Sequence, residues 1–153
     1  MWSVVADAYC VTTNGVTRKD GRLVMGAGVA KDFNMKFKGV DRVLGSMVES
    51  NGNNVYYANL YDPSLSKVWT LNGVQYNVVS FPTKHHWSQP SDLGLIEKSA
   101  KQLKELADVY KWTKIVIPMP GCGLGGLKWN DVQEVLIEAW GETDDRFIVV
   151  SNA

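Results

Sequence analysis

Two kinds of apolar pattern alternate along the chain and predict its secondary structure. Segments rich in β-branched and aromatic residues predict strands, at residues 4–13, 54–60, 67–71, 74–81, 114–119 and 146–151. Apolar residues repeated at spacings of three and four predict helices, at residues 29–37, 40–48, 93–110 and 131–140. Asn72-Gly73 predicts a hairpin turn between 67–71 and 74–81. Ser91 or Asp92 is expected to cap the third helix. Asn130 is expected to cap the fourth helix, with Gln133 placed to form a capping box with it.

The order of these segments predicts an α/β protein: a three-layer α/β/α sandwich with a largely parallel or mixed central sheet. The chain has 153 residues, with no repeats and no linkers, so we expect a single domain over residues 1–153. Ligands bind beyond the carboxyl ends of the strands in such sheets. Four loops carry unusual residues and should meet at that rim. The first contains Asn14, the second Gly26 and Gly28, the third Lys84, and the fourth Gly121 to Gly126.

Composition narrows the class of protein. Lysine plus arginine equals aspartate plus glutamate, 16 against 16, which argues against bulk attraction to nucleic acid or to a membrane surface. No apolar run approaches the roughly 20 residues of a membrane span, and the N-terminus lacks the features of a signal peptide. Two cysteines, Cys10 and Cys122, are too few for a disulfide framework or a zinc site. We expect a cytoplasmic monomer without a metal or cofactor.

Two glycine-rich loops suggest the chemistry. Four glycines fall within residues 121–126, between a predicted strand and a predicted helix, and Met25-Gly26-Ala27-Gly28-Val29-Ala30 runs into another helix. Glycine lets the backbone turn through positive φ and approach a ligand closely, and free amides at a helix start suit phosphate. One such loop can equally be a tight turn without a ligand. Two of them in one small domain predict a diphosphate held between them.

Three motifs in order resemble the macro domain, an ADP-ribose-binding fold: Val11-Thr12-Thr13-Asn14, the loop at 25–30, and Gly121-Cys122-Gly123-Leu124-Gly125-Gly126-Leu127. A fourth, Phe81-Pro82-Thr83-Lys84-His85-His86-Trp87, is similar to the lysine loop of DarG-type macro domains, which remove ADP-ribose from thymidine in DNA. It is also similar to the loop of the terminal ADP-ribose protein glycohydrolase, which cleaves ADP-ribose from glutamate. That enzyme has an aspartate where this chain has Gly125, and the DarG type has glycine, so Gly125 favours the DarG type.

The resemblance implies roles for individual residues. Lys84 would act at the anomeric carbon of the distal ribose, as a nucleophile or by electrostatic stabilisation, and Asn14 would hydrogen-bond that ribose. Without the resemblance, Lys84 is an exposed loop lysine and Asn14 a turn asparagine. Asp7 would either hold the adenine amino group or be structural. The glycine loops would bind the phosphates and the distal ribose through Met25, Gly26, Ala27, Gly28, Val29, Ala30, Pro120, Gly121, Cys122, Gly123, Leu124 and Gly125.

The remaining candidates lie beside Lys84 or in the second glycine loop. Trp87 would stack on a base or leaving group, or would pack the loop onto the core. His85 and His86 would relay a proton or form a surface pair, and with no nearby carboxylate they make a poor metal site. Cys122 is expected to be a packed thiol rather than a nucleophile.

These residues predict an ADP-ribosyl glycohydrolase that removes ADP-ribose from a modified macromolecule, with DNA as the first candidate. A non-catalytic reader of ADP-ribose and a phosphatase acting on ADP-ribose 1″-phosphate are the alternatives. Because the net charge is zero, any contact with single-stranded DNA should be local, through Lys84, His85, His86, Trp87 and Lys128. A bacterial or phage-borne antitoxin of the DarG type is the setting that this function would fit.

Overall fold

A parallel sheet flanked by helices forms the centre of the molecule. The computed structural model describes residues 1–62, 64, 69–71 and 73–151. Four strands, β1 (Ala8–Thr13), β4 (Val78–Pro82), β5 (Ile115–Pro118) and β6 (Phe147–Val150), form a sheet in the order β4-β1-β5-β6. Every pairing in this sheet is parallel. The α/β fold is therefore confirmed, and the mixed sheet that we allowed for is corrected to a parallel one within the described residues.

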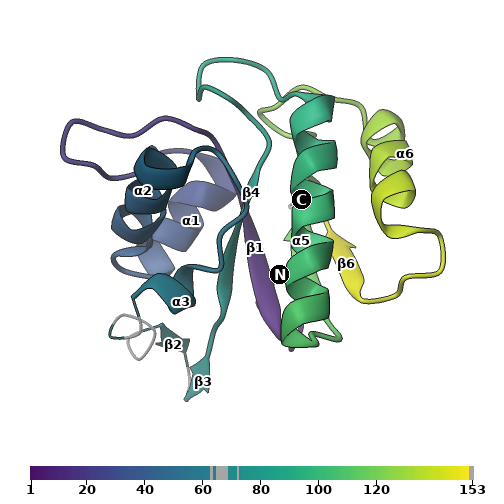
Figure 1. Ribbon diagram of the computed structural model, residues 1–153, viewed down its shortest axis with the longest axis horizontal. Helices are drawn as coiled ribbons and strands as arrows, with labels where there is room; N and C mark the ends of the chain where they lie inside the picture. Colours follow the sequence, from purple (N-terminus) through teal and green to yellow (C-terminus); the bar gives the residue numbers. More distant parts are fainter. Residues whose placement is uncertain (63, 65–68, 72, 152–153) are drawn as a thin grey trace.

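Two layers of helices cover the two faces of the sheet (Figure 1). On one side lie α1 (Gly28–Lys36) and α2 (Val40–Asn51), with the short α3 (Ala58–Tyr61) below them. On the other side lie α5 (Leu93–Tyr110) and α6 (Trp129–Trp140). All four predicted helices are present, and Asp92 caps α5 by accepting a hydrogen bond from Gly94 N.

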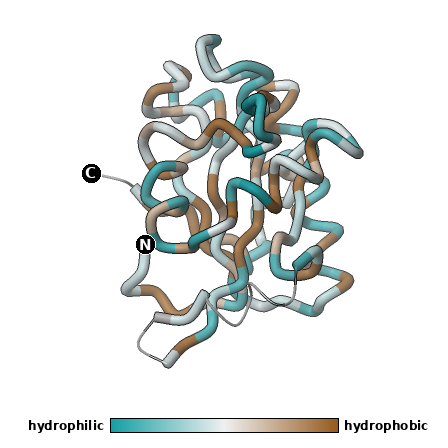
Figure 2. Tube along the Cα trace, turned by 90° about the vertical axis from the view of Figure 1, so that its left-hand side faces the viewer, coloured by the Kyte–Doolittle hydropathy of each residue, from teal (hydrophilic) through white to brown (hydrophobic). Residues whose placement is uncertain are grey.

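The alternation of side chains along β1 builds a separate core on each face of the sheet. Tyr9 and Val11 pack with the residues of α1 and α2, whereas Ala8 and Cys10 pack with those of α5 and α6. The apolar segments accordingly gather in the middle of the fold, and hydrophilic ones dominate its periphery (Figure 2). Because the strands are parallel, all their carboxyl ends lie at one rim of the sheet, and the loops that follow them meet there.

The predicted strand at 54–60 is wrong. Residues 58–61 form α3, and only Tyr57 makes an isolated bridge, to Val79 of β4. The reason is the buried side chain of Asn59, which accepts a hydrogen bond from Val78 N at 2.9 Å and donates one to Tyr76 O at 2.9 Å. A side-chain amide thus bonds backbone groups at the start of β4 in place of a neighbouring strand.

Other predicted boundaries also shift. The hairpin exists in shorter form, as β2 (Thr70–Leu71) and β3 (Val74–Gln75). Residues 78–81 of the predicted 74–81 strand belong to β4 in the main sheet, and residues 76 and 77 connect the two strands. Asn72 and the start of the 67–71 segment lie outside the described residues. Helix α6 begins at Trp129 after Lys128, without a side-chain cap, so the predicted cap at Asn130 is wrong. Strand β1 begins at Ala8 rather than at residue 4.

Candidate functional site

A pocket of about 1020 Å³ lies at the carboxyl-end rim of the sheet. It is formed by the loops that follow β1, β4 and β5, by the start of α1, and by the two ends of the described chain. Its lining residues are Met1, Trp2, Thr12, Thr13, Asn14, Val24, Met25, Gly26, Ala27, Gly28, Val29, Ala30, Lys31, Asp32, Thr83, Lys84, Trp87, Ser91, Met119, Gly121, Gly123, Leu124, Gly125 and Ser151. The four loops singled out in the sequence therefore meet at one site.

The loop from Thr83 to Asp92 carries Lys84, and hydrogen bonds hold its two ends. Thr83 N and Lys84 N both donate to Thr13 O at the end of β1, at 2.9 and 3.3 Å, and Asn53 Nδ2 donates to Lys84 O at 3.0 Å. Asp92 N donates to Thr83 O at 2.9 Å and closes the loop. The backbone of Lys84 is thus held from both sides, while its side chain lines the pocket.

The side chain of Lys84 is not neutralised within the described part of the chain. Its Nζ donates to the backbone oxygen of Trp87 at 3.4 Å, and it forms none of the salt bridges among the described residues. Trp87 lines the pocket beside it and is 55% exposed, so its ring is available to a ligand rather than packed into the core.

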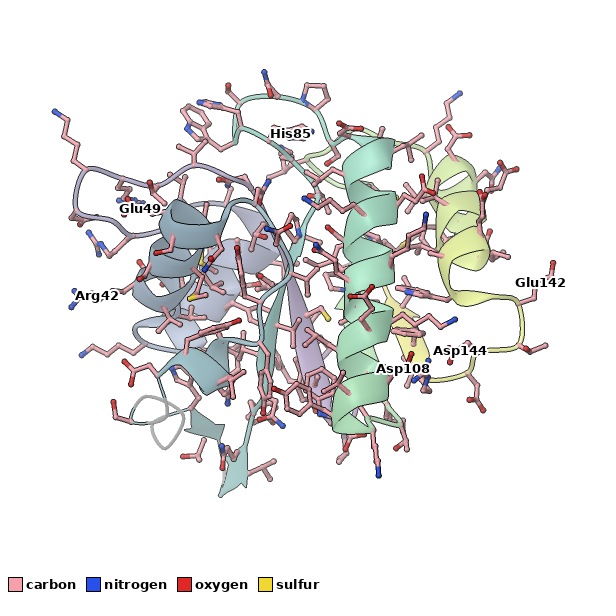
Figure 3. The ribbon with its side chains drawn as sticks, in the orientation of Figure 1. Arg42, Glu49, His85, Asp108, Glu142 and Asp144 are labelled. Carbon is pink, nitrogen blue, oxygen red and sulfur yellow. The ribbon has the colours of Figure 1, made fainter. Side chains whose placement is uncertain are left out.

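His85 has a carboxylate partner that sequence spacing did not indicate. Its Nε2 lies 2.7 Å from Asp92 Oδ2, at the N-terminal end of α5 (Figure 3). This hydrogen bond is the main reason that the pKa of Asp92 is held below its ordinary value, and the bond from Gly94 N adds to the effect. Neither His85 nor His86 lines the pocket. His85 bonds Asp92, and His86 Nδ1 accepts from Ser88 N at 3.1 Å, so both side chains make contacts within the loop.

Asn14 lines the pocket and also shapes it. Its Nδ2 donates to Val24 O at 2.9 Å, and its Oδ1 accepts from Val16 N at 2.9 Å. The side chain therefore folds the segment between β1 and the first glycine loop. One amide hydrogen and one oxygen lone pair remain for a ligand.

The two glycine loops provide different surfaces. Helix α1 has no side-chain cap, so the amides of its first turn, from Gly28 to Ala30, are open to the pocket. In the second loop, a Cβ at Gly123 would meet nothing within 4 Å. A Cβ at Gly125 would lie 2.1 Å from Ser91 Oγ and 2.5 Å from Gly121 O. Only glycine fits at 125, whereas Gly123 borders free space.

Three predicted ligand residues do not line the pocket. Asp7 precedes β1 at the opposite end of the strand from Asn14, and its Oδ2 accepts from Thr113 N at 2.8 Å and Lys114 N at 3.1 Å. The adenine role for Asp7 is thus corrected to the structural one. Pro120 and Cys122 are also outside the lining. The thiol of Cys122 points to Pro120 O, packs against the core, and has a pKa raised by burial.

The residues of this chain from 16 to 136 match the family described as Macro domain. The chain belongs to the macro domain family. The solved macrodomain of Thermus aquaticus DarG superposes on this chain with a TM-score of 0.74 at 25% identity. That comparison covers 99% of this chain and 93% of the other. The structure titled Thermosipho africanus DarTG in complex with ADP-ribose gives a TM-score of 0.74 at 24% identity, over 95% of this chain and 38% of that one.

Curated relatives of this macro domain carry the name DNA ADP-ribosyl glycohydrolase. The protein from Thermus aquaticus (strain ATCC BAA-2747 / Y51MC23) is 30% identical over 116 residues, which is 76% of this chain and 31% of the relative. The protein from Mycobacterium tuberculosis (strain ATCC 25618 / H37Rv) is 33% identical over 69 residues, 45% of this chain and 20% of the relative. This chain thus spans about a third or less of the length of the relatives it matches.

The macro-domain pocket includes residues that sequence reasoning missed. They are Met1, Trp2, Thr12, Thr13, Val24, Lys31, Asp32, Thr83, Ser91, Met119 and Ser151. Several directly adjoin predicted site residues and could have been found as neighbours. Trp2 and Asp32 could not, because their place depends on how α1 packs on the sheet. Within the described residues no cluster of His, Cys, Asp or Glu could hold a metal ion, and no helix combines the length and apolar character that a bilayer span requires.

Proposed function

We propose that this protein hydrolyses the bond between ADP-ribose and a modified macromolecule, with ADP-ribosylated DNA as the preferred substrate and Lys84 as the catalytic side chain. The observation that carries the proposal is a pocket lysine whose backbone is held by Thr13 at the end of β1 and by the side chain of Asn53. Within the described residues this lysine forms no ion pair. The names of the curated relatives support DNA as the substrate.

The open amides of α1 and the second glycine loop suit the diphosphate. Backbone N–H groups at a helix N-terminus attract an anion through hydrogen bonds and through the helix dipole. The free space at Gly123 borders the same part of the pocket. A ligand whose phosphates lie between these loops would direct its distal ribose toward Asn14 and Lys84, at the ends of β1 and β4.

The chemistry needed at that ribose is hydrolysis of a glycosidic bond. Water attacks the anomeric carbon, the bond to the leaving base breaks, and the base departs with its electron pair, through a transition state that resembles an oxocarbenium ion. The attacking water loses a proton to solvent, and the departing base takes one up from solvent. A positively charged Lys84, which pairs with no carboxylate in the described part of the chain, would stabilise the negative charge that develops on the leaving base. Within the described residues its Nζ bonds the backbone oxygen of Trp87 at 3.4 Å. Electrostatic stabilisation uses the charged form of the side chain, so it requires no prior loss of a proton.

Trp87 supports DNA as the substrate. A half-exposed indole beside the catalytic lysine can stack on the modified base or on its neighbour, and base stacking is tolerant of sequence. Lys128 lies before α6, outside the pocket lining, so any further contact with the DNA backbone would be peripheral.

The test is single-turnover release of ADP-ribose from a thymidine-modified oligonucleotide, with a glutamate-modified protein assayed in parallel. Lys84→Ala should lower release from DNA by about 100-fold or more, the loss typical of one stabilising donor. Lys19→Ala removes an exposed lysine outside the pocket and should leave release unchanged. Turnover that survives in Lys84→Ala refutes the lysine role. Release from protein alone refutes DNA as the substrate, and binding of ADP-ribose without release would indicate a reader or a phosphatase.

A further inference from the structure

Ser91 lies where two loops of the pocket meet. Its amide donates to Gly125 O at 3.0 Å, and the amide of the next residue, Asp92, donates to Thr83 O at 2.9 Å. Thr83 directly precedes Lys84, and Gly125 belongs to the second glycine loop. Ser91 is also one of the residues that line the pocket. It therefore lies at the end of the pocket that contains Lys84, between the loop that carries this lysine and the second glycine loop.

The hydroxyl of Ser91 is buried and has no use within the described part of the chain. The residue is 8% exposed, and its Oγ makes no hydrogen bond with a described residue. Asp92, and not Ser91, caps α5. Because no described imidazole or carboxylate bonds Oγ, Ser91 lacks the general base that a nucleophilic serine requires. A buried hydroxyl without a partner destabilises a fold, so its place in a pocket wall points to a use in binding.

The hydroxyl rests against the backbone of the second glycine loop. A Cβ at Gly125 would lie 2.1 Å from Ser91 Oγ and 2.5 Å from Gly121 O. Gly121 O accepts a hydrogen bond from Leu127 N at 2.9 Å and none from Ser91. A serine side chain has three staggered rotamers, and rotation of Ser91 breaks no hydrogen bond to the described residues. The hydroxyl is thus free to turn from Gly125 toward the pocket that Ser91 lines.

We propose that Ser91 turns its hydroxyl to the distal ribose of ADP-ribose and bonds a ribose hydroxyl, so that the pocket distinguishes ADP-ribose from ADP. The proposal rests on the proposed function, because it takes ADP-ribose as the ligand. The distal ribose is the part of the ligand assigned to this end of the pocket, which Asn14 and Lys84 also line. A serine hydroxyl both donates and accepts a hydrogen bond, as does each hydroxyl of a ribose, so the two groups are matched partners.

The test compares ADP-ribose with ADP, which lacks the distal ribose, by calorimetric titration. Ser91→Ala should bind ADP-ribose about 3- to 10-fold more weakly than the wild-type protein, the loss expected for one neutral hydrogen bond. Its affinity for ADP should stay that of the wild-type protein. The ratio of the two affinities is the informative quantity, because a general distortion of the pocket would weaken the binding of both ligands.

Unfolding in denaturant separates a ligand contact from a structural one. Ser91→Ala removes a buried hydroxyl that bonds no described residue, so the midpoint of unfolding should stay the same or rise. Ser99 is the matched control, because it is buried on α5 and its Oγ donates to Pro82 O at 2.7 Å. Ser99→Ala should lower the midpoint and keep the wild-type ratio of affinities, since Ser99 lies outside the pocket lining.

Each variant removes a single oxygen atom, so both should fold. An affinity ratio that is the same in the wild-type protein and in Ser91→Ala overturns the proposal, and a lower midpoint in that variant would then assign Ser91 a structural role. A wild-type protein that binds ADP-ribose no more tightly than ADP overturns it too. If Ser91→Ala reduces the ratio but the wild-type protein releases no ADP-ribose from DNA or protein, the proposed function fails and the assignment of Ser91 stands. Binding of neither ligand refutes both.

Discussion

Gly123 and Gly125 lie two residues apart in the loop after β5, and alanine should destabilise the protein at Gly125 but hardly affect its stability at Gly123. Neither glycine has a positive φ, so the difference between them is steric. A Cβ at Gly125 would lie 2.1 Å from Ser91 Oγ, 2.5 Å from Gly121 O and 2.9 Å from Gly121 C. A Cβ at Gly123 would meet nothing within 4 Å.

The size of the effect follows from what would have to move. Two of the three close atoms at Gly125 belong to the backbone of Gly121, so no side-chain rotation relieves them. Overpacking of this kind costs about 1–3 kcal/mol, and we expect Gly125→Ala to lie in the upper half of that range. For a domain of this size the loss corresponds to a Tm lower by roughly 5–10 °C. Gly123→Ala should change stability by less than about 0.5 kcal/mol.

Denaturant unfolding and calorimetric titration with ADP-ribose measure both consequences. Gly125→Ala should also weaken binding, because Gly121 lines the pocket and would be displaced. Combining Gly125→Ala with Ser91→Ala removes the closest of the three contacts and should recover part of the stability, which would appear as a coupling energy between the two positions. Equal stability of Gly123→Ala and Gly125→Ala would refute this account of the loop.

Two further predictions concern charge. Gly123→Glu should abolish ADP-ribose binding in a folded protein, because it adds bulk and negative charge to free space beside the proposed diphosphate position; unchanged affinity by calorimetry would contradict that position. His85→Ala should raise the pKa of Asp92 toward its ordinary value of 3.8, as followed by carboxyl NMR, since the bond from His85 is the largest cause of its depression. A carboxyl group whose pKa is lower in the folded than in the unfolded protein stabilises the fold at pH values above its unfolded pKa. That stability is lost as the pH falls through the folded pKa. His85→Ala should therefore reduce the loss of stability at acidic pH. An Asp92 that titrates as in wild type would argue against the bond.

Local sequence patterns were sufficient to predict most of the helices and strands and part of the pocket lining. The helical spacing of α5 and the glycines at 26, 28, 121 and 123 are properties of adjacent residues, so they can be read without tertiary structure. The segment at 54–60 has a strand composition, but Asn59 bonds β4 through its side chain, which no local pattern reveals. Composition predicted a strand where the structure has a helix, because the hydrogen bond between Asn59 and Val78, 19 residues apart in the sequence, determines the backbone conformation there.

The same distinction explains the site residues that were wrong or missed. Asp7 was a candidate because it is acidic and near the N-terminus, but its environment is set by the pairing of β1 with β5, which brings Thr113 to its carboxylate. Asp32 was not considered, because a charged residue on a short helix resembles any solvated position. Its place in the pocket depends on how α1 packs against β1 and Trp2. Residues whose role depends on the packing of elements are the ones that sequence reasoning misses.

The zero net charge of the chain becomes informative once the pocket is known. Lys31 and Lys84 are the cationic side chains among the described lining residues, and Asp32 offsets one of them. Attraction for a diphosphate must then come largely from backbone amides, at the start of α1 and in the second glycine loop, which add partial positive charge without adding net charge. In the proposed function, this arrangement would leave the charge of Lys84 available for the reacting end of the ligand. Affinity for ADP-ribose should consequently depend only weakly on salt, since few side-chain charges are screened.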